Sequence, residues 1–256
     1  MGAASTSPVK PGIAVRALRE IEEMRAMVEL QRRVWGYSEL DAVPDQMFVV
    51  ARESGGQVLG AYEGETPVGF ALAFAGIHGG EAYLHSHMVG VLREYQDRGV
   101  GRLLKLAQRD EALARGIALI EWTFDPLQIK NAHFNIARLG AIVRRYIPNV
   151  YGRTSSPLHA GLPTDRLVAE WRLNSSHVHR VLNGQRHVPS GQSFRISLPG
   201  NIRQICVEDP AKAESIQSVL REQFTAQIAA GRAAMGFELS QDQGSYVLEP
   251  YEDRID

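Results

Sequence analysis

The sequence predicts a mixed α/β fold in which a mostly antiparallel central sheet is flanked by helices and followed by a C-terminal α+β extension. Short runs of alternating or β-branched apolar residues recur along the chain and indicate strands. Amphipathic runs with apolar residues three and four apart stand between them and indicate helices. Because the two kinds of element are interleaved, their order favours an α/β sandwich over an all-helical or all-strand fold.

The first part of the chain supplies the elements of the central sheet. Glycine, proline and aspartate mark most of their ends, as at Pro44, Gly55-Gly56, Asp125-Pro126 and Gly140. The expected elements are a strand Ile13–Leu18, helices Ile21–Trp35 and Pro44–Glu53, strands Val58–Tyr62, Val68–Phe74 and Tyr83–Val91, a helix Gly101–Arg115, a strand Ala118–Phe124, a helix Leu127–Leu139 and a segment with alternating positions, Ile142–Tyr151.

The remainder of the chain is less clearly patterned. A long helix is predicted to begin at Asp209-Pro210 and to end at Gly231. Its expected apolar stripe is Ile216, Val219, Leu220, Phe224 and Ile228. The other expected elements are strands Leu167–Leu173, Phe194–Leu198 and Ile202–Val207, a short helix Ser176–Leu182, and a terminal hairpin of Met235–Leu239 with Tyr246–Leu248.

Composition excludes several classes of protein. The chain has 256 residues, 44% hydrophobic and 22% charged, with a net charge of −1, so no basic field indicates nucleic-acid binding. Cys206 is the only cysteine, which rules out an intrachain disulfide and zinc sites that need two cysteines. Neither a signal peptide nor an apolar run of membrane-spanning length is present, so we expect a cytoplasmic protein without membrane contact.

A glycine-bearing turn, Gln96–Gly101, joins a strand to an amphipathic helix. Gly99 and Gly101 permit backbone angles and close approach that a side chain would forbid. The amides from Arg98 to Arg102 can then point at one spot on the positive end of the helix, which would suit a pyrophosphate. An ordinary strand-to-helix turn is the alternative. On the helix, Leu104 and the other apolar residues of the same face are expected to be buried. Lys105 and Arg109 are expected to lie on the opposite, polar face.

The motif Gln96-x-x-Gly99-x-Gly101, set between a strand and a helix, resembles the acyl-CoA motif of GNAT superfamily N-acyltransferases. The order of elements is similar to that of this superfamily from residue 12 to 172. The resemblance implies a GNAT acyltransferase domain at 12–172, after a disordered tail at 1–11. Residues 173–256 are then an extension packed on the domain or on a partner subunit. It also implies acetyl-CoA, or another acyl-CoA such as succinyl-CoA, as co-substrate.

The resemblance assigns cofactor contacts to three places. The strand before the turn is expected to bulge, most easily at Gly90, and to bind pantetheine and the thioester oxygen with its amides. Asn131 and Phe134, early in a later helix, would lie near the cofactor. The full set of expected cofactor-binding residues is Met88, Val89, Val91, Gln96, Asp97, Arg98, Gly99, Val100, Gly101, Arg102, Asn131 and Phe134.

Two histidines, His85 and His87, stand on the strand before the turn, and strand alternation places both on one face with Val89 and Val91. They can be a pair of hydrogen-bonded structural residues, a metal site with Glu121 as a third ligand, or a general base. Serotonin N-acetyltransferases of the superfamily carry a His-x-His pair at the matching place, which favours the general base. We therefore expect His85, His87 and Glu121 to be catalytic and no metal to be required.

Other polar residues are candidates for the acceptor. Asp125 and Arg138 are expected to contact substrate, although Asp125 also suits a plain turn and Arg138, with Arg144 and Arg145, a solvated basic face. Ile136 occupies a position where many superfamily members have a tyrosine that protonates the leaving thiolate. Tyr146 and Tyr151 are the residues considered in its place.

Together these features predict an acyl-CoA-dependent N-acyltransferase that moves an acetyl group to a small amine or amino acid by direct attack. Three alternatives stay open: an N-succinyltransferase acting on amino acids, a non-catalytic CoA-binding regulatory module, and a metal-dependent enzyme. We expect no nucleic-acid partner, and a homodimer through the extension is one option for assembly.

Overall fold

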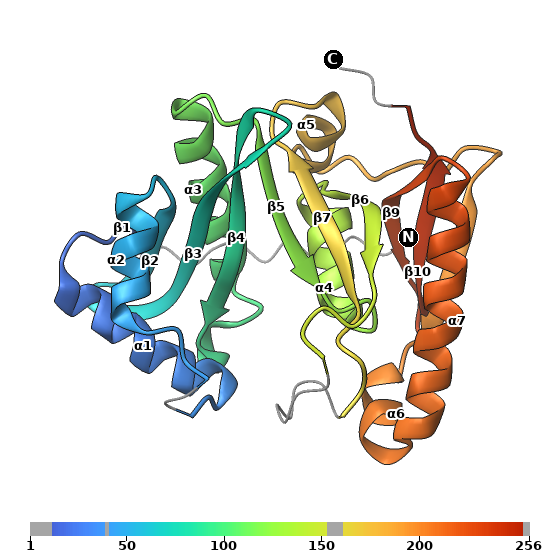
Figure 1. Cartoon of the computed structure of the whole chain (residues 1–256), viewed down its shortest axis with the longest axis horizontal. Helices are drawn as coiled ribbons and strands as arrows, with labels where there is room; N and C mark the ends of the chain where they lie inside the picture. The colour runs from blue at the N-terminus through green and yellow to red at the C-terminus, as the bar shows by residue number, and fades with distance from the viewer. Residues whose placement is uncertain (1–11, 39–40, 153–160, 253–256) are drawn as a thin grey trace. The chain divides into compact units, whose positions relative to one another are not determined.

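The structure is a computed structural model, and it describes residues 12–38, 41–152 and 161–252. The predicted tail, 1–11, lies outside these residues. The chain divides into two compact units, Met1–Ile120 and Glu121–Asp256, and each is described by itself. Both are mixed α/β units in which mostly antiparallel strands are flanked by helices, as the sequence predicts (Figure 1).

The first unit is a four-stranded antiparallel sheet with helices on both faces. Its strands lie in the order β1-β2-β3-β4, and each pairs with its neighbours in sequence. The elements are β1 (Ile13–Ala17), α1 (Ile21–Trp35), α2 (Asp45–Glu53), β2 (Gln57–Glu63), β3 (Thr66–His78), β4 (Glu81–Val91), a 3-10 turn η1 (Arg93–Tyr95) and α3 (Val100–Ala114). The predicted helix and strand types are confirmed throughout this unit.

Two apolar layers hold the first unit together. On one face, α1 and α2 bury Met24, Met27 and Phe48 against Phe70 and Leu72 of β3. The other face is covered by α3, whose Val100 and Leu104 pack on β2 and β3. Figure 1 shows α1 and α2 on one side of these strands and α3 on the other. Each fully buried aliphatic or aromatic side chain contributes about 1.5–3 kcal/mol, so both layers are substantial.

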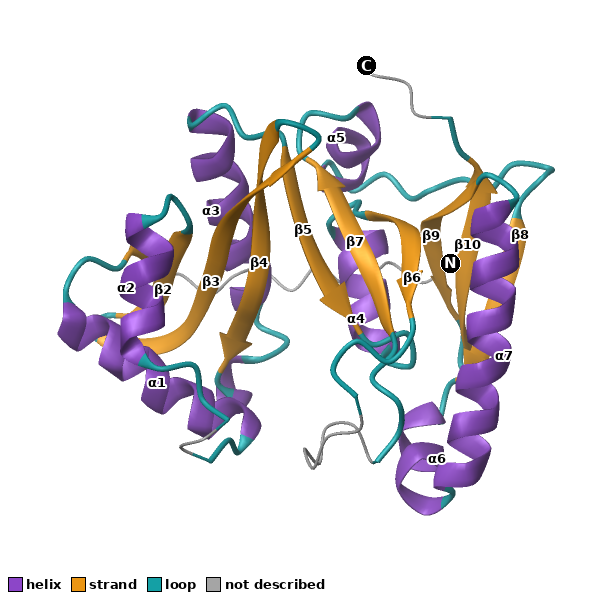
Figure 2. Ribbon diagram, viewed as in Figure 1, coloured by secondary structure: helices purple, strands orange, loops and turns teal. Residues whose placement is uncertain are grey.

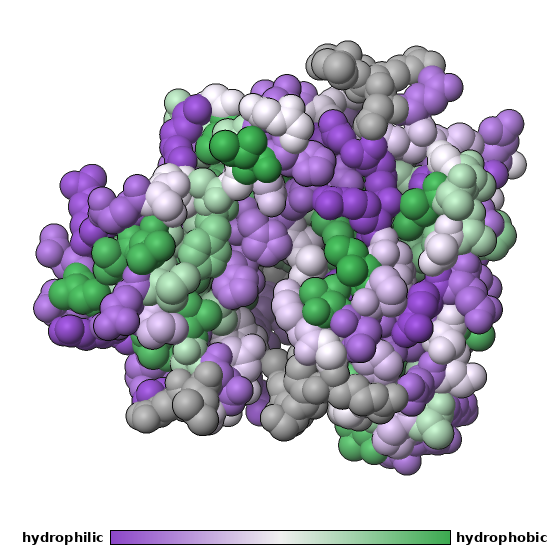
Figure 3. All heavy atoms as spheres, viewed as in Figure 1, coloured by the Kyte–Doolittle hydropathy of each residue, from purple (hydrophilic) through white to green (hydrophobic). Residues whose placement is uncertain are grey.

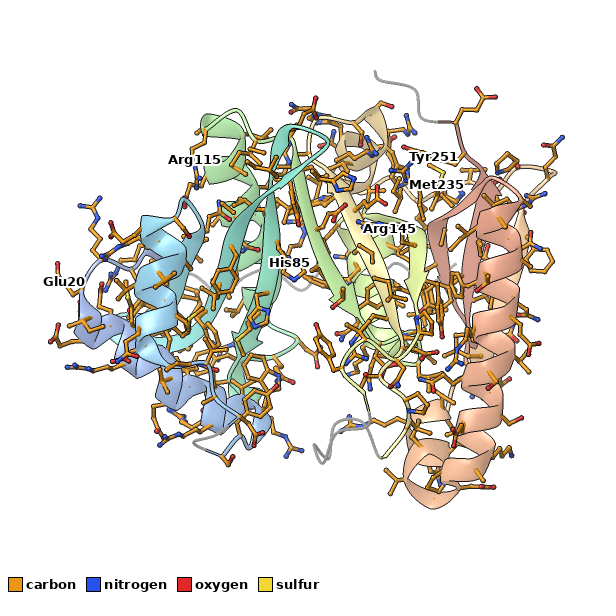
Figure 4. All side chains as sticks on the ribbon, in the orientation of Figure 1. Glu20, His85, Arg115, Arg145, Met235 and Tyr251 are labelled. Atoms are coloured by element: carbon orange, nitrogen blue, oxygen red, sulfur yellow. The ribbon has the colours of Figure 1, made fainter. Side chains whose placement is uncertain are left out.

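Local signals explain where α1 begins and ends. Its first turn is closed by a capping box, in which the Glu23 carboxylate accepts from the Glu20 amide at 3.0 Å. Gly36 ends the helix in the left-handed conformation, with φ of 70°, and donates its N–H to the Arg32 carbonyl. The end of α3 is held by Arg115, labelled in Figure 4, which donates to the carbonyls of Gly55 and Gly56.

The bulge in β4 does not lie where the sequence predicts. The register with β3 shifts between Ser86, opposite Ala73, and Met88, opposite Leu72, so the extra residue is His87. Gly90 pairs regularly with Phe70. A Cβ on Gly90 would come within 2.7 Å of the Phe70 ring, so this glycine makes room for the aromatic core instead of a bulge.

The bulge also corrects the predicted faces of β4. A strand's side chains alternate between faces only while the pleat is regular. Beyond His87 the alternation is reversed: Met88 packs against the core under α1 and α2, whereas Val89 and Val91 pack against the core under α3. His85, opposite Phe74, therefore does not share a face with Val89 and Val91.

The second unit contains the rest of the predicted domain and the extension. The strand order within it is β7-β6-β9-β10-β8, and β5 (Leu119–Phe124) spans the boundary between the units. Its other elements are α4 (Ile129–Ala132), the π-helix η2 (His133–Arg138), β6 (Ile142–Ile147), β7 (Arg166–Arg172), α5 (Ser176–Leu182), β8 (Phe194–Pro199), α6 (Ile202–Glu208), α7 (Pro210–Ala229), β9 (Arg232–Leu239) and β10 (Gln243–Pro250).

The extension joins this unit through its sheet. Strand β9 pairs antiparallel with β6, at Val143 opposite Ala234, and then with β10. Helix α7 packs on β6, β8 and β9, and Figure 2 shows it running along these strands. The predicted terminal hairpin and long helix are confirmed. The predicted boundary between domain and extension, at 172, remains a prediction.

Two expectations for the second unit are wrong, and a third is confirmed with a change of helix type. The predicted strand Ile202–Val207 is helix α6, because Ile202 and Ile205 are buried three residues apart, the spacing of a helix. The predicted helix Leu127–Leu139 is helical over Ile129–Arg138, as a single α-turn followed by a π-helix, a form that often marks functional sites. In α7, Val219 is 49% exposed, and the buried residues are Ala213, Gln217, Leu220 and Phe224.

The surface carries no large apolar area on the face that Figure 3 presents. Hydrophilic residues predominate, with separate hydrophobic areas such as the one over α2, where Met47 and Val50 are exposed. Single exposed apolar side chains of this kind are normal for folded proteins. Among the described residues, no helix is long and apolar enough to span a membrane.

Candidate active site

The N-terminus of α3 has the geometry of an anion site. Gly99 is the N-cap residue in the left-handed conformation, with φ of 84° and ψ of 0°, and no side chain caps the helix. The first helical hydrogen bond runs from the Leu103 N–H to the Gly99 carbonyl at 3.0 Å, so the amides of Val100 and Gly101 have no partner within the helix. A Cβ on Gly101 would have Val91 as its nearest neighbour, at 4.0 Å.

Side chains around the turn hold it in place. The Gln96 amide donates to the Val91 carbonyl at 3.1 Å, which fixes the turn against the end of β4. Asp97 has a positive φ of 58°. Arg98 forms an ion pair with Glu63 at 3.3 Å, and its guanidinium lies 4.5 Å from the centre of the Tyr95 ring. The first turn of α3 contains no acidic residue, although Asp97 stands two residues before the N-cap Gly99.

The two predicted histidines lie together on β4. Their ring centroids are 6.2 Å apart, and the His87 ring makes an edge contact with Phe74 at 5.6 Å. Strand β4 carries His85, which is half-buried and labelled in Figure 4, and His87, which is exposed at the bulge. The bulge thus directs both imidazoles to the Phe74 side of the strand.

Desolvation by neighbouring protein atoms favours the neutral form of both histidines, although His87 is exposed to solvent at the bulge. Desolvation lowers the pKa of His85 below its usual 6.5, and the charges of His87 and Lys105 lower it further. The pKa of His87 is lowered by desolvation alone. Both imidazoles are therefore neutral at neutral pH, the form in which a histidine can accept a proton.

The second unit holds the predicted carboxylate Glu121 in an ion-pair network. Its Oε1 lies 2.6 Å from Nη2 of Arg145, a residue of β6 labelled in Figure 4. Arg145 also approaches the buried Glu170 at 3.6 Å, and Arg144 contacts the same carboxylate at 2.7 Å. Consecutive strand residues normally point to opposite faces, but the register of β6 on β7 shifts at Arg144, so both arginines reach Glu170.

The other predicted contacts in the second unit are spread over three short segments. Asp125 accepts the Leu127 amide at 2.8 Å, which fits its alternative role in a plain turn. Asn131 is exposed in α4, and Phe134 is partly buried in the π-helix. Burial lowers the pKa of His133, and the charge of Arg138 lowers it further.

The residue at the position of the expected tyrosine is apolar and has no contact with solvent. Ile136 is fully buried in the π-helix. Of the two tyrosines considered in its place, Tyr146 donates its hydroxyl to the buried carboxylate of Asp165, and burial raises its pKa far above 10. Tyr151 is 55% exposed, with the Arg166 guanidinium 5.5 Å from its ring. Tyr146 is therefore poorly suited to release a proton near neutral pH.

Comparison with known proteins identifies the family. Residues 21–140 match the family model described as Acetyltransferase (GNAT) family. Residues 21–140 therefore form a GNAT acetyltransferase domain. No curated protein sequence matches the chain. The matched stretch includes the histidine pair, the glycine turn and all of α3.

Solved structures share the fold of the GNAT domain at low sequence identity. The ribosomal-protein-S18-alanine N-acetyltransferase from Escherichia coli is 18% identical, with a TM-score of 0.51 over 64% of this chain and 96% of that chain. The protein yncA from Salmonella typhimurium, with its cofactor acetyl-CoA, is also 18% identical, with a TM-score of 0.53 over 64% and 95%. An Arabidopsis thaliana protein in complex with the bisubstrate analogue CoA-Ac-MVNAL is 16% identical, with a TM-score of 0.50 over 62% and 97%.

Sequence reasoning missed a buried polar cluster in the GNAT domain. Lys105 and Gln108 of α3 are 3% and 0% exposed, although Lys105 was expected on the polar face of this helix. Their positions continue the buried series Val100, Leu104 and Ala112 at helical spacing, and that spacing is the signal that could have found them. The usual preference of lysine for the surface concealed it.

A metal centre finds no support in the described part of the chain. No group of three histidine, cysteine, aspartate or glutamate side chains is placed there to hold a metal ion.

Proposed function

We propose that this protein is an acetyl-CoA-dependent N-acetyltransferase that acetylates a small amine or amino acid by direct attack. The proposal depends chiefly on one observation: a neutral histidine pair stands on the strand that leads into the uncapped N-terminus of α3. A proton acceptor and an anion site are then adjacent parts of one short segment. The match of residues 21–140 to the GNAT family supports the same reaction class.

The turn before α3 would bind the pyrophosphate of the co-substrate. The amides of Val100 and Gly101 and the positive end of a 15-residue helix favour a phosphate group there. The Gln96 side chain supports the turn by its hydrogen bond to the Val91 carbonyl, so the anion would be bound by backbone amides and not by this side chain. Asp97, Arg98 and Arg102 flank this position.

Strand β4 would position the thioester. In an antiparallel pair, alternate residues direct their N–H groups away from the partner strand. Some of the amides from Met88 to Val91 therefore point away from β3, and we assign to them the pantetheine arm and the thioester oxygen. An N–H aimed at the developing oxyanion lowers the barrier to attack and is worth about 3–4 kcal/mol in known cases.

The histidine pair would act as general base. An amine is mostly protonated at neutral pH and must lose a proton before it can attack. In the proposed step, His85 or His87 takes one proton from the substrate ammonium, directly or through water, and the freed amine nitrogen bonds to the carbonyl carbon. The C–S bond then breaks, and a second proton from the same nitrogen passes to the departing sulfur, so that coenzyme A leaves as a thiol. Glu121, which forms an ion pair with Arg145, Asp125 and Arg138 belong to the second unit, and the roles expected for them from the sequence remain predictions.

The test begins with binding and turnover. Calorimetry should detect acetyl-CoA binding to the purified protein, and a panel of amines and amino acids should reveal one that releases free CoA thiol. Succinyl-CoA belongs in the same panel as the alternative donor. Peptides with free N-termini belong there too, because the Escherichia coli structure is that of a ribosomal-protein-S18-alanine N-acetyltransferase.

A histidine double variant separates catalysis from binding. His85→Ala with His87→Ala should lower kcat about 100-fold or more, since general-base catalysis contributes about 10²–10⁴, while the Kd for acetyl-CoA changes less than about twofold. The exposed His78 at the end of β3 supplies the control, and His78→Ala should behave as wild type. A protein that binds acetyl-CoA but releases no thiol with any amine would be a non-catalytic binding module; one that binds no acyl-CoA would end the proposal.

A further inference from the structure

A chain of buried polar groups lies behind the histidine-bearing strand. The ammonium of Lys105, on α3, donates to the Ser86 hydroxyl at 2.8 Å. Ser86 in turn donates to the side-chain oxygen of Gln108 at 3.0 Å, and Gln57 donates to the Gln108 main-chain carbonyl at 2.9 Å. All four residues are less than 5% exposed. The cluster connects α3 to β4 and to β2.

The location of Ser86 makes this cluster relevant to the site. Ser86 stands between His85 and His87 and is the last regularly paired residue before the bulge. Its hydroxyl points to the α3 side of the sheet, whereas the His85 ring lies on the Phe74 side. The hydrogen bonds of Ser86 therefore fix the backbone at the point where the strand changes register. The same point of the backbone sets the direction of both imidazoles.

A lysine is an unusual residue for this position. Burying an ammonium is costly, and an apolar residue in the stripe of Val100 and Leu104 would pack against the sheet without that cost. Burial lowers the pKa of Lys105 well below 10.5, so the protein keeps its charged form only at a cost in free energy. A group that stability alone does not explain is a candidate for a functional role.

We propose that Lys105 is a positioning residue for the histidine pair: through Ser86 it anchors the bulge at His87, and as a buried cation it disfavours a second positive charge on His85. The two imidazoles are then held in one direction and kept in the neutral form that can accept a proton. This inference rests on the proposed general-base function.

The charged groups around the pair are few. His87, on the same strand, and Lys105 are the two that lower the pKa of His85 after burial itself. Strand β3 opposes the region with Ala73 and Phe74, which do not ionise. On α3, Arg102 and Arg109 stand three and four residues from Lys105, and Arg109 is paired with Asp110 at 3.3 Å. Because like charges disfavour one another, His87 and Lys105 favour a neutral His85.

The test replaces the cation and the hydroxyl separately and follows the histidines by NMR. Lys105→Met removes the charge at similar volume, and Ser86→Ala removes the hydrogen bond but keeps the charge. With ¹³C-labelled histidine, the titration midpoint of His85 should rise by about 0.5–1 pH unit in the Lys105→Met variant. The acidic limb of the kcat/KM profile should move by a similar amount. Lys212→Met, at an exposed position of α7, is the control and should leave both unchanged.

The Ser86→Ala variant tests the geometric half of the proposal. The titration midpoint of His85 should stay near that of wild type. The kcat should fall about tenfold, because a small displacement of a catalytic group lowers the rate strongly. A folded Lys105→Met protein with unshifted histidine midpoints would overturn the electrostatic half, and Ser86→Ala with wild-type kcat would overturn the geometric half.

Two further outcomes test the electrostatic half of the proposal and the proposed function separately. The chain has four lysines, so ¹³Cε labelling of wild-type protein gives four signals, and a Lys105 that carries no charge between pH 6 and 8 would overturn the electrostatic half without any variant. If the histidine midpoints respond to Lys105→Met but no amine is ever acetylated, the coupling stands and the proposed function fails.

Discussion

At the scale of single residues, desolvation favours the neutral form of four histidines. His85, His87, His133 and His177 all have lowered pKa values, and desolvation is the first cause for each. The sequence predicted His85 and His87 because two histidines on one strand face are rarely core filling. His177 carries no such signal, since its burial follows from the packing of α5 and not from its neighbours in sequence.

The buried His177 should make stability depend on pH. Burial lowers its pKa from 6.5 to about 4, and its Nε2 has no hydrogen-bond partner. Above pH 6.5 both folded and unfolded states are neutral here; as pH falls from 6.5 to 4, only the unfolded chain gains the proton, so stability is lost. The loss attributable to His177 is about 2 kcal/mol at pH 5.

Urea denaturation at pH 7 and pH 5 measures this effect. His177→Phe should reduce the fall in unfolding free energy between the two pH values by that amount. The exposed His179 of the same helix supplies the control, and His179→Phe should keep the wild-type dependence. Equal pH dependence in His177→Phe and wild type would refute the assignment.

At the scale of elements, the sequence predicted most helices and strands, because caps and glycine stops act locally. Helix α1 and helix α5 have the predicted bounds. The bulge of β4 was misplaced because it depends on a partner: Phe70 fills the space beside Gly90, and the Lys105–Ser86 contact fixes the strand four residues earlier. Pairing register of this kind cannot be read from one strand alone.

The two glycines of the α3 turn should respond differently to alanine. Gly99→Ala places a Cβ at φ of 84°, which costs about 1–2 kcal/mol of stability, and it should weaken acetyl-CoA binding several-fold. Gly101 lies inside the helix with open space around it, where alanine is the better helix former. Gly101→Ala should therefore keep stability and affinity near wild type. Thermal unfolding and calorimetry report the two quantities; equal losses in both variants would argue against the assigned role of Gly99.

At the scale of the whole molecule, the segment after residue 172 completes the second unit. Besides the β6–β9 pairing, Arg221 of α7 forms two hydrogen bonds with the fully buried Asp165, at 2.8 and 3.0 Å. The sequence predicted that the extension would pack on something. The sequence does not show which strand the extension pairs with, because pairing at a sheet edge needs only free backbone groups and an apolar face.

Arg221 should be the main polar anchor of the extension. Arg221→Met leaves the Asp165 carboxylate buried without its cation and should lower the unfolding free energy of the second unit by about 3 kcal/mol. Arg195→Met is the matched control, because its ion pair with Glu238 is exposed and worth less than about 1 kcal/mol.

Tryptophan fluorescence can follow the second unit alone. Of the three tryptophans, Trp122 and Trp171 contact each other in the second unit, and Trp35 lies in the first. In a Trp35→Phe background, the emission reports the second unit only. Comparable denaturation midpoints for Arg221→Met and Arg195→Met would contradict the anchoring role of Arg221.

The pairing of β9 with β6 has a practical consequence for anyone who expresses the GNAT domain alone. A fragment that stops near residue 172 would retain β6 but lose the strand that satisfies its outer backbone groups around Val143. Such a bare edge recruits other strands. The fragment should then form soluble oligomers or inclusion bodies even if its sequence pattern is that of a complete domain, whereas the full chain covers this edge itself.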